Sequence, residues 1–210
     1  MANTDQMATE TQRHPKFYIP SGDMVIQVEK TIFKIHSHFL TMESEVFRDM
    51  ITVAPRANDH NGGTDYEPLV LSGDSVEGWE LFLSSIYRAN SFKLITFTGK
   101  ETIQILRITH KYCMQSAEDE LISRLKEETG TLGFLNLMVA SRIIDSKELY
   151  DTALKGLIAS EPKPTLEEAN MIGMNAYHAI MSQSWTTRKC GYCHQGNNLR
   201  TKCFSCHQWQ

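Results

Sequence analysis

Four of the five cysteines lie in the last 21 residues of this 210-residue chain, as two pairs with the spacing Cys-x2-Cys and nine residues between the pairs. A Cys-x2-Cys turn lets two thiolates bind one metal ion, and two such turns complete a tetrahedral Zn²⁺ site. We therefore predict one structural zinc ion, with the ligands Cys190, Cys193, Cys203 and Cys206.

Two histidines leave the ligand set open, because His194 and His207 each follow a cysteine pair directly and could replace a cysteine. The thiols could also carry no metal, or could be joined in disulfides. Disulfides are disfavoured because the cysteine count is odd and the polar N-terminus lacks the apolar core of a signal peptide. A four-cysteine site has no open coordination position, so we expect the ion to order the tail rather than to catalyse a reaction.

The composition of the chain limits the classes of protein to which it can belong. Hydrophobic residues make up 41% of the chain and charged residues 22%, as in an ordinary globular protein. No apolar run approaches the roughly 18 residues of a membrane span. We therefore expect a cytoplasmic and/or nuclear protein. Neither a Gly-rich phosphate loop nor a Ser/His/Asp or paired-carboxylate pattern stands out, so we expect no enzymatic activity and no small-molecule substrate.

The net charge of −4 is unevenly distributed. The first 168 residues carry −8 (17 basic minus 25 acidic), and the remaining 42 carry +4 and no acidic residue. An acidic body argues against a large nucleic-acid surface. The basic tail also contains Tyr192, Phe204 and Trp209, whose rings could stack on bases. Nucleic-acid or chromatin binding through this tail is therefore a second candidate function.

The segment 23–50 carries the clearest structural pattern. Apolar residues alternate over 24–28 and again at Phe33 and Ile35, with a polar break at 29–31, which predicts a tight antiparallel hairpin with half-buried strands. Apolar residues then recur at steps of three and four from Phe39 to Met50, which predicts two helices.

Further elements follow along the chain. Turn-forming residues over 54–67 predict a loop, 68–71 a short strand, and 88–98 either an edge strand or a packed loop. Asp74 and Glu77 have the spacing of a capping box, which predicts a helix from there to about Tyr87. A helix from about Gly99 is expected to bury His110 and Cys113 on its apolar stripe, and 117–128 forms another.

The last ordered part is predicted to be helical: two helices over 132–160 and one over 165–185, with Thr165 as its N-cap and Glu168 at the third position. Strands followed by clustered helices indicate an α+β fold with a small sheet.

At this point the chain resembles the BTB/POZ family. The residues that carry the resemblance are Asp23, Phe33, Ile35, His36, Leu40, Ser44, Phe47 and Met50, followed by the pair Lys111 and Tyr112. The helices after 128 are similar to the extension of the large fungal, mushroom-type BTB set, through Glu167, Glu168, Ala169 and Gly173 before a Cys-containing tail. The domains implied are a disordered N-terminus (1–16), a BTB/POZ domain (17–128), a helical extension (129–184) and a zinc-binding tail (185–210).

The resemblance implies a protein-interaction adaptor or scaffold. It would associate with itself, bind other BTB chains, or dock onto a cullin as a substrate adaptor of a ubiquitin ligase. In the family, cullin contacts come from the region that corresponds to Trp79–Tyr87, the segment 88–97 and the helical extension. Asp23 and His36 occupy framework positions, where Asp23 is expected to be buried near a dimer interface or bonded to the hairpin. An exchanged strand through Phe17–Ile19 and a monomer are equally open.

Overall fold

A computed structural model of the protein describes residues 11–53, 63–87 and 96–186. The chain divides into two compact units, residues 1–121 and 122–210. The first unit contains β1 (Gln12–Tyr18), β2 (Met24–Val28), β3 (Thr31–Ile35), α1 (Ser37–Glu43), α2 (Glu45–Val53), β4 (Leu69–Val70), α3 (Val76–Ile86) and α4 (Gly99–Lys111). Helix α5 (Gln115–Glu127) runs across the division, and α6 (Gly130–Ile143), α7 (Lys147–Ala159), α8 (Leu166–Ile172) and α9 (Met174–Thr186) belong to the second unit. The α+β prediction is confirmed for the described residues.

The predicted hairpin is confirmed. Strands β2 and β3 pair antiparallel, with Met24 opposite Ile35 and Val28 opposite Thr31. Glu29 makes the turn possible by adopting a positive φ of 53°. The strands are buried on both faces rather than half-buried as predicted, since even Val25 is only 5% exposed.

Strand β1 corrects the prediction that residues 1–16 are disordered, since it begins at Gln12 and pairs in parallel with β3. The strand order in the described sheet is β1-β3-β2-β4. Between Arg13 and Tyr18 the register shifts, and the buried ring of His14 closes this bulge: its Nδ1 accepts hydrogen bonds from the backbone N–H groups of Lys16 and Phe17 at 3.2 and 3.0 Å. Because the bulge interrupts the alternation of apolar residues, the sequence shows no strand pattern here.

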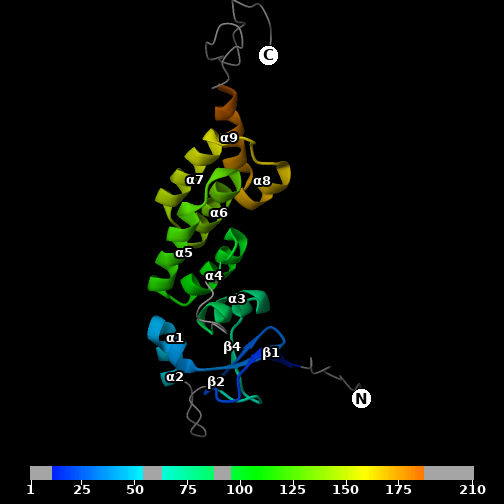
Figure 1. Cartoon of the computed structure of the whole chain (residues 1–210), viewed down its shortest axis with the longest axis vertical. Helices are drawn as coiled ribbons and strands as arrows, with labels where there is room; N and C mark the ends of the chain where they lie inside the picture. Colours follow the sequence, from blue (N-terminus) through cyan, green and yellow to red (C-terminus); the bar gives the residue numbers. More distant parts are fainter. Residues whose placement is uncertain (1–10, 54–62, 88–95, 187–210) are drawn as a thin grey trace, which may run out of the picture. The chain divides into compact units, whose positions relative to one another are not determined.

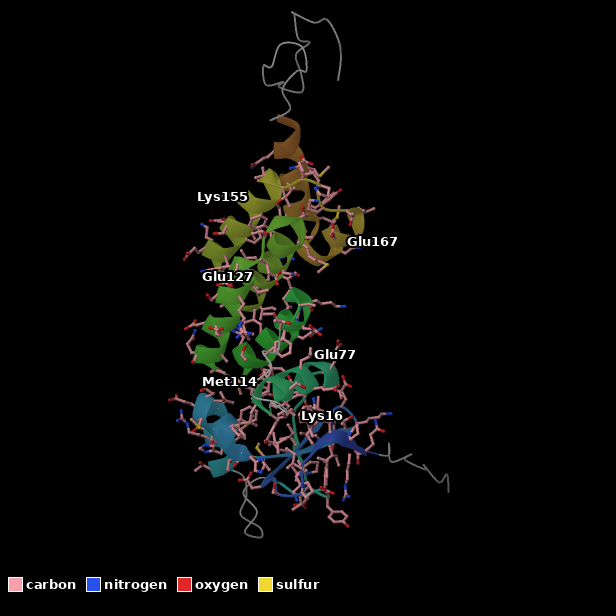
Figure 2. All side chains as sticks on the ribbon, in the orientation of Figure 1. Lys16, Glu77, Met114, Glu127, Lys155 and Glu167 are labelled. Carbon is pink, nitrogen blue, oxygen red and sulfur yellow. The ribbon has the colours of Figure 1, made fainter. Side chains whose placement is uncertain are left out.

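Helix α3 lies next to the sheet in Figure 1, α4 packs against α3, and much of the core of the first unit is in this region. Side chains fill the space between the sheet and α3, as Figure 2 shows around the labelled Lys16 of β1 and Glu77 of α3. The largest fully buried side chains here include Trp79, Phe33 and Phe47. Burying such aromatic residues supplies much of the stability of a domain of this size.

Helix α3 begins one residue later than predicted. Its N-cap is Ser75, whose hydroxyl accepts the N–H of Gly78 at 3.1 Å. Asp74 is not the cap, because its carboxylate accepts hydrogen bonds from a side chain of α3 and from the end of α4. The predicted end near Tyr87 is confirmed, since this residue is the C-cap.

Helix α4 begins as predicted but ends before Cys113, the last position of its predicted apolar stripe. A capping box joins Thr98 and Glu101 at its start, and the last helical residue is Lys111. Cys113 then adopts a positive φ of 53° and is exposed, so its predicted burial is wrong. His110 is exposed too, and its Nδ1 lies 2.9 Å from a carboxylate oxygen of Glu118. Its predicted place in the core is therefore wrong as well.

The second unit is helical, with α6 packed on α7 and α8, and α9 packed on α7 and α8. The single helix predicted over 165–185 is in fact two helices, because Gly173 adopts φ 79° and ψ 148°, a region open almost only to glycine. The guanidinium of Arg142 donates to the carbonyls of Met171 and Ile172 beside this break. The predicted capping box of Thr165 and Glu168 is confirmed.

Candidate interaction site

The start of α1 is held by Asp23, which directly precedes β2. One carboxylate oxygen accepts the backbone N–H of Ser37 at 2.7 Å and the other accepts its hydroxyl at 2.8 Å. Partial burial acts to raise the pKa of Asp23, but these hydrogen bonds outweigh it and the pKa lies below its usual range. Asp23 is exposed and bonded to the first residue of α1, whereas the resemblance implied that it is buried near a dimer interface or bonded to the hairpin.

The side chain of Tyr87, at the end of α3, fixes the residue before α1. Its hydroxyl accepts the backbone N–H of His36 at 2.7 Å and lies 3.0 Å from Nδ1 of the same residue. The other ring nitrogen of His36 lies 3.2 Å from the hydroxyl of Ser21. Burial raises the pKa of Tyr87, which keeps its hydroxyl neutral. His36 and Tyr87 thus join the hairpin, α1 and α3.

Two large apolar side chains of α1 face solvent on this support. Phe39 is 39% exposed and Met42 is 62% exposed. The ring of Phe39 packs edge-on against Tyr87, with ring centres 5.2 Å apart. We call the surface formed by Phe39 and Met42 the α1 surface. It presents apolar area on a helix whose position is fixed from beneath, an arrangement typical of a protein-binding surface.

Trp79, predicted to lie in a partner-binding region, is a core residue. It is fully buried, and its indole N–H donates to Asp74 at 2.9 Å. The same carboxylate accepts Lys111 at 2.6 Å and the hydroxyl of Tyr112 at 2.5 Å. Burial and this hydrogen bond raise the pKa of Tyr112 far above its usual value. Trp79 therefore supports α3 and α4 from within, and it offers no surface to a partner.

A second feature lies on the face of the sheet opposite the core, where the chain segment before β4 crosses toward β1. Asp65 in this segment accepts the hydroxyl of Tyr18 at 2.7 and 2.8 Å and the Nε–H of Arg13 at 3.0 Å. The Tyr18 hydrogen bond, aided by Arg13, lowers the pKa of Asp65. A cavity of about 540 Å³ lies under the segment, and its lining includes Tyr18, Val25, Lys34, Asp65 and Tyr66.

Sequence reasoning missed both surfaces. Arg13 and Tyr18 lie 52 and 47 residues from Asp65, so local patterns contain no signal of these contacts. The exposed face of α1 was hidden because Phe39 and Met42 belong to the same apolar spacing as the buried Phe47.

The whole predicted zinc-binding tail lies outside the described residues. This applies to the predicted ligands Cys190, Cys193, Cys203 and Cys206, to His194 and His207, and to the tail aromatics. Within residues 11–53, 63–87 and 96–186, no group of three or more His, Cys, Asp or Glu could hold a metal ion. Most of the segment 88–97, predicted to contact a cullin, also lies outside the described ranges.

A search of curated proteins gave no match. In the described part of the chain, no helix has the length and apolar character needed to cross a membrane. The family model of the BTB/POZ domain matches residues 12–129, starting at the first residue of β1 and ending just after α5. Because this match covers more than half of the 210 residues, the chain belongs to the BTB/POZ family, whose domains are protein–protein interaction modules.

Proposed function

We propose that this protein is a non-catalytic adaptor or scaffold that associates with a second BTB chain, in the first instance another copy of itself, through the α1 surface. The observation that carries the proposal is the exposure of Phe39 and Met42 on a short helix that is fixed by the rest of the unit.

The support beneath α1 makes this surface suitable for binding. Asp23 holds the first helical N–H of α1, and Tyr87 holds the residue before it. A rigid apolar surface loses little conformational entropy when a partner covers it. Phe39 also contacts the ring of Tyr87, so a partner that covers Phe39 would rest on an aromatic pair.

Self-association is tested by light scattering of the purified chain over a range of concentrations. We expect a particle of twice the 24.0 kDa mass of one chain. Replacing Met42→Glu places a charge on the apolar surface and should shift the equilibrium to the monomer. Met174→Glu is the matched control, because Met174 is 60% exposed on α9 and Met42 is 62% exposed on α1.

Two results would contradict the proposal. One is a wild-type chain that stays monomeric at every concentration. The other is a dimer that Met42→Glu and Met174→Glu weaken equally, because the α1 surface would then have no special part in association.

The more specific roles stay predictions. Docking onto a cullin would make the protein a substrate adaptor, and a zinc-bearing basic tail would suit a nucleic-acid or chromatin factor. Membership of the fungal, mushroom-type set and a cytoplasmic or nuclear location also rest on the sequence alone. Of these, cullin docking and zinc binding are tested most directly, by the experiments described in the Discussion.

A further inference from the structure

Strand β4 is the last strand of the described sheet, so only one of its two edges has a neighbouring strand in the described part of the chain. That inner edge pairs with β2, where Leu69 lies beside Ile26. The next bond, from the N–H of Leu71 to the carbonyl of Gln27, is 2.9 Å long. Because the backbone groups of successive strand residues point to opposite sides, the N–H and carbonyl of Val70 point outward. The side chain of Val70 is 58% exposed, so an apolar side chain and an unpaired backbone stand at the same position.

The residues on either side of Val70 limit what can pair with this outer edge. Pro68 has no N–H, and a proline there prevents a long ladder of hydrogen bonds. On the other side, the carbonyl of Ser72 already accepts the ammonium of Lys111 at 2.6 Å. Natural sheets often protect their edges with proline or lysine, but the strand Leu69–Val70 contains neither. The open part of the edge is therefore short and centred on Val70.

A second copy of the same edge matches this pattern. Two β4 strands related by a two-fold axis run antiparallel, and Val70 can then lie directly opposite Val70 of the other copy. The two valines exchange both backbone hydrogen bonds, and their exposed side chains lie next to each other on one face. In the same register Pro68 lies opposite Ser72. The N–H that proline lacks would have donated to the Ser72 carbonyl, which Lys111 already satisfies.

We therefore propose that β4 is a second self-association surface, at which two copies of the chain pair antiparallel with Val70 at the centre. A shifted register that placed Pro68 opposite Val70 would leave the Val70 carbonyl without a donor, so the backbone itself selects the centred register. A few hydrogen bonds and two valines bury far less than the roughly 1,200 Å² of a standard interface. We expect weak, reversible pairing that increases with concentration and adds to association through the α1 surface.

Disulfide trapping tests this register directly. Opposite residues in a hydrogen-bonded antiparallel pair have Cα atoms about 5.5 Å apart, which lies within the range of a disulfide. Under mild oxidation, full-length Val70→Cys should form a dimer linked through position 70. Mass spectrometry of the digested dimer distinguishes this disulfide from any that involves a native cysteine. Tyr66→Cys is the matched control, because Tyr66 is 96% exposed but its two copies would lie at opposite ends of the paired segment.

A charge at the centre of the contact should prevent the pairing. Sedimentation of the wild-type chain over a range of concentrations should show growth beyond the particle that the α1 surface forms. Val70→Lys places two positive charges directly opposite each other and should abolish this growth. Tyr66→Lys adds the same charge four residues away, on a side chain that is more exposed than Val70, and should retain the growth.

Either of two results would overturn the β4 contact: no more disulfide through position 70 than through position 66, or equal loss of growth in Val70→Lys and Tyr66→Lys. An edge that pairs with a strand of a different protein gives the first of these results. The contact does not rest on the α1 surface, so the disulfide through position 70 should also form in the Met42→Glu chain. Failure of the α1 surface therefore leaves this disulfide in place, and failure of the β4 edge leaves the effect of Met42→Glu in place.

Discussion

The imidazole of His14 provides a sharp test of how β1 is attached to the sheet. His14 is 6% exposed and stacks on Phe33 with ring centres 4.7 Å apart. Its Nδ1 accepts two backbone N–H groups, so the ring is neutral with its proton on Nε2. Replacing His14→Phe keeps an aromatic ring of similar shape but removes the acceptor from both N–H groups.

The expected cost follows from those two donors. A buried donor without an acceptor costs roughly 1–3 kcal/mol. The N–H of Phe17 is buried, whereas that of Lys16 is only partly buried and can be hydrated instead. We therefore expect His14→Phe to lower the free energy of unfolding of the first unit by about 2 kcal/mol. His14→Asn is the control, because its side-chain oxygen can accept a hydrogen bond near the position of Nδ1.

Lowering the pH should weaken the same hydrogen bonds of His14, because protonation of the ring removes the acceptor at Nδ1. Burial lowers the pKa of His14 below its ordinary value of 6.5, because the apolar surroundings disfavour the charged ring. Since the unfolded chain binds the proton more readily, the stabilisation is complete above pH 6.5 and is lost as the pH falls through 6.5 toward the lower folded pKa. Wild type should lose stability relative to His14→Asn over this interval.

Urea unfolding gives the free energies, and amide hydrogen exchange at Phe17 reports the local contact. His14→Phe should speed this exchange, whereas His14→Asn should leave it close to wild type. This role of His14 is contradicted if His14→Phe is as stable as wild type, or if the wild-type and His14→Asn proteins respond identically to acid.

Three further predictions concern the second unit, the tail and the partner. Gly173→Ala should destabilise the α8–α9 break by about 1–3 kcal/mol, because alanine is strained at this backbone conformation; urea unfolding checks this, and an unchanged midpoint would contradict it. Replacing Cys203 and Cys206 with Ser should release one zinc ion per chain, measured by elemental analysis, while the circular dichroism of the helices stays unchanged; purified wild type without zinc would refute the site. Native mass spectrometry with a cullin N-terminal domain should show a complex if the protein is a ligase adaptor, and its absence at micromolar concentrations would remove that role.

Local sequence patterns predicted most of the elements because their causes are local. The β2–β3 hairpin follows from alternation around a two-residue turn, and the start of α8 follows from the capping box of Thr165 and Glu168. The BTB/POZ family could also be predicted from the sequence, because Asp23, His36 and Tyr112 stand at spacings typical of the BTB fold. The hairpin and capping signals depend on neighbours within a few positions, which a sequence displays directly.

The errors arose where distant contacts decide the structure. Asp74 was expected to cap α3, but donors 37 and 38 residues away at the end of α4 occupy its carboxylate. Cys113 continued an apolar spacing, yet the helix ends at Lys111 and turns the thiol outward. Neither surface of the candidate site could be predicted, because exposure on α1 and the cavity under Asp65 depend on how the whole unit packs.

The contacts of Asp74 also determine how the first unit opens. One carboxylate joins α3, through Trp79, to the end of α4, through Lys111 and Tyr112. The backbone carbonyl of Tyr112 in turn accepts the hydroxyl of Ser44, the buried residue between α1 and α2, at 2.6 Å. The ends of these helices cannot fray one at a time without leaving buried polar groups unpaired. The helix that presents Phe39 and Met42 therefore belongs to the same cooperative opening unit as α3 and α4, and its amide protons should exchange with theirs rather than ahead of them.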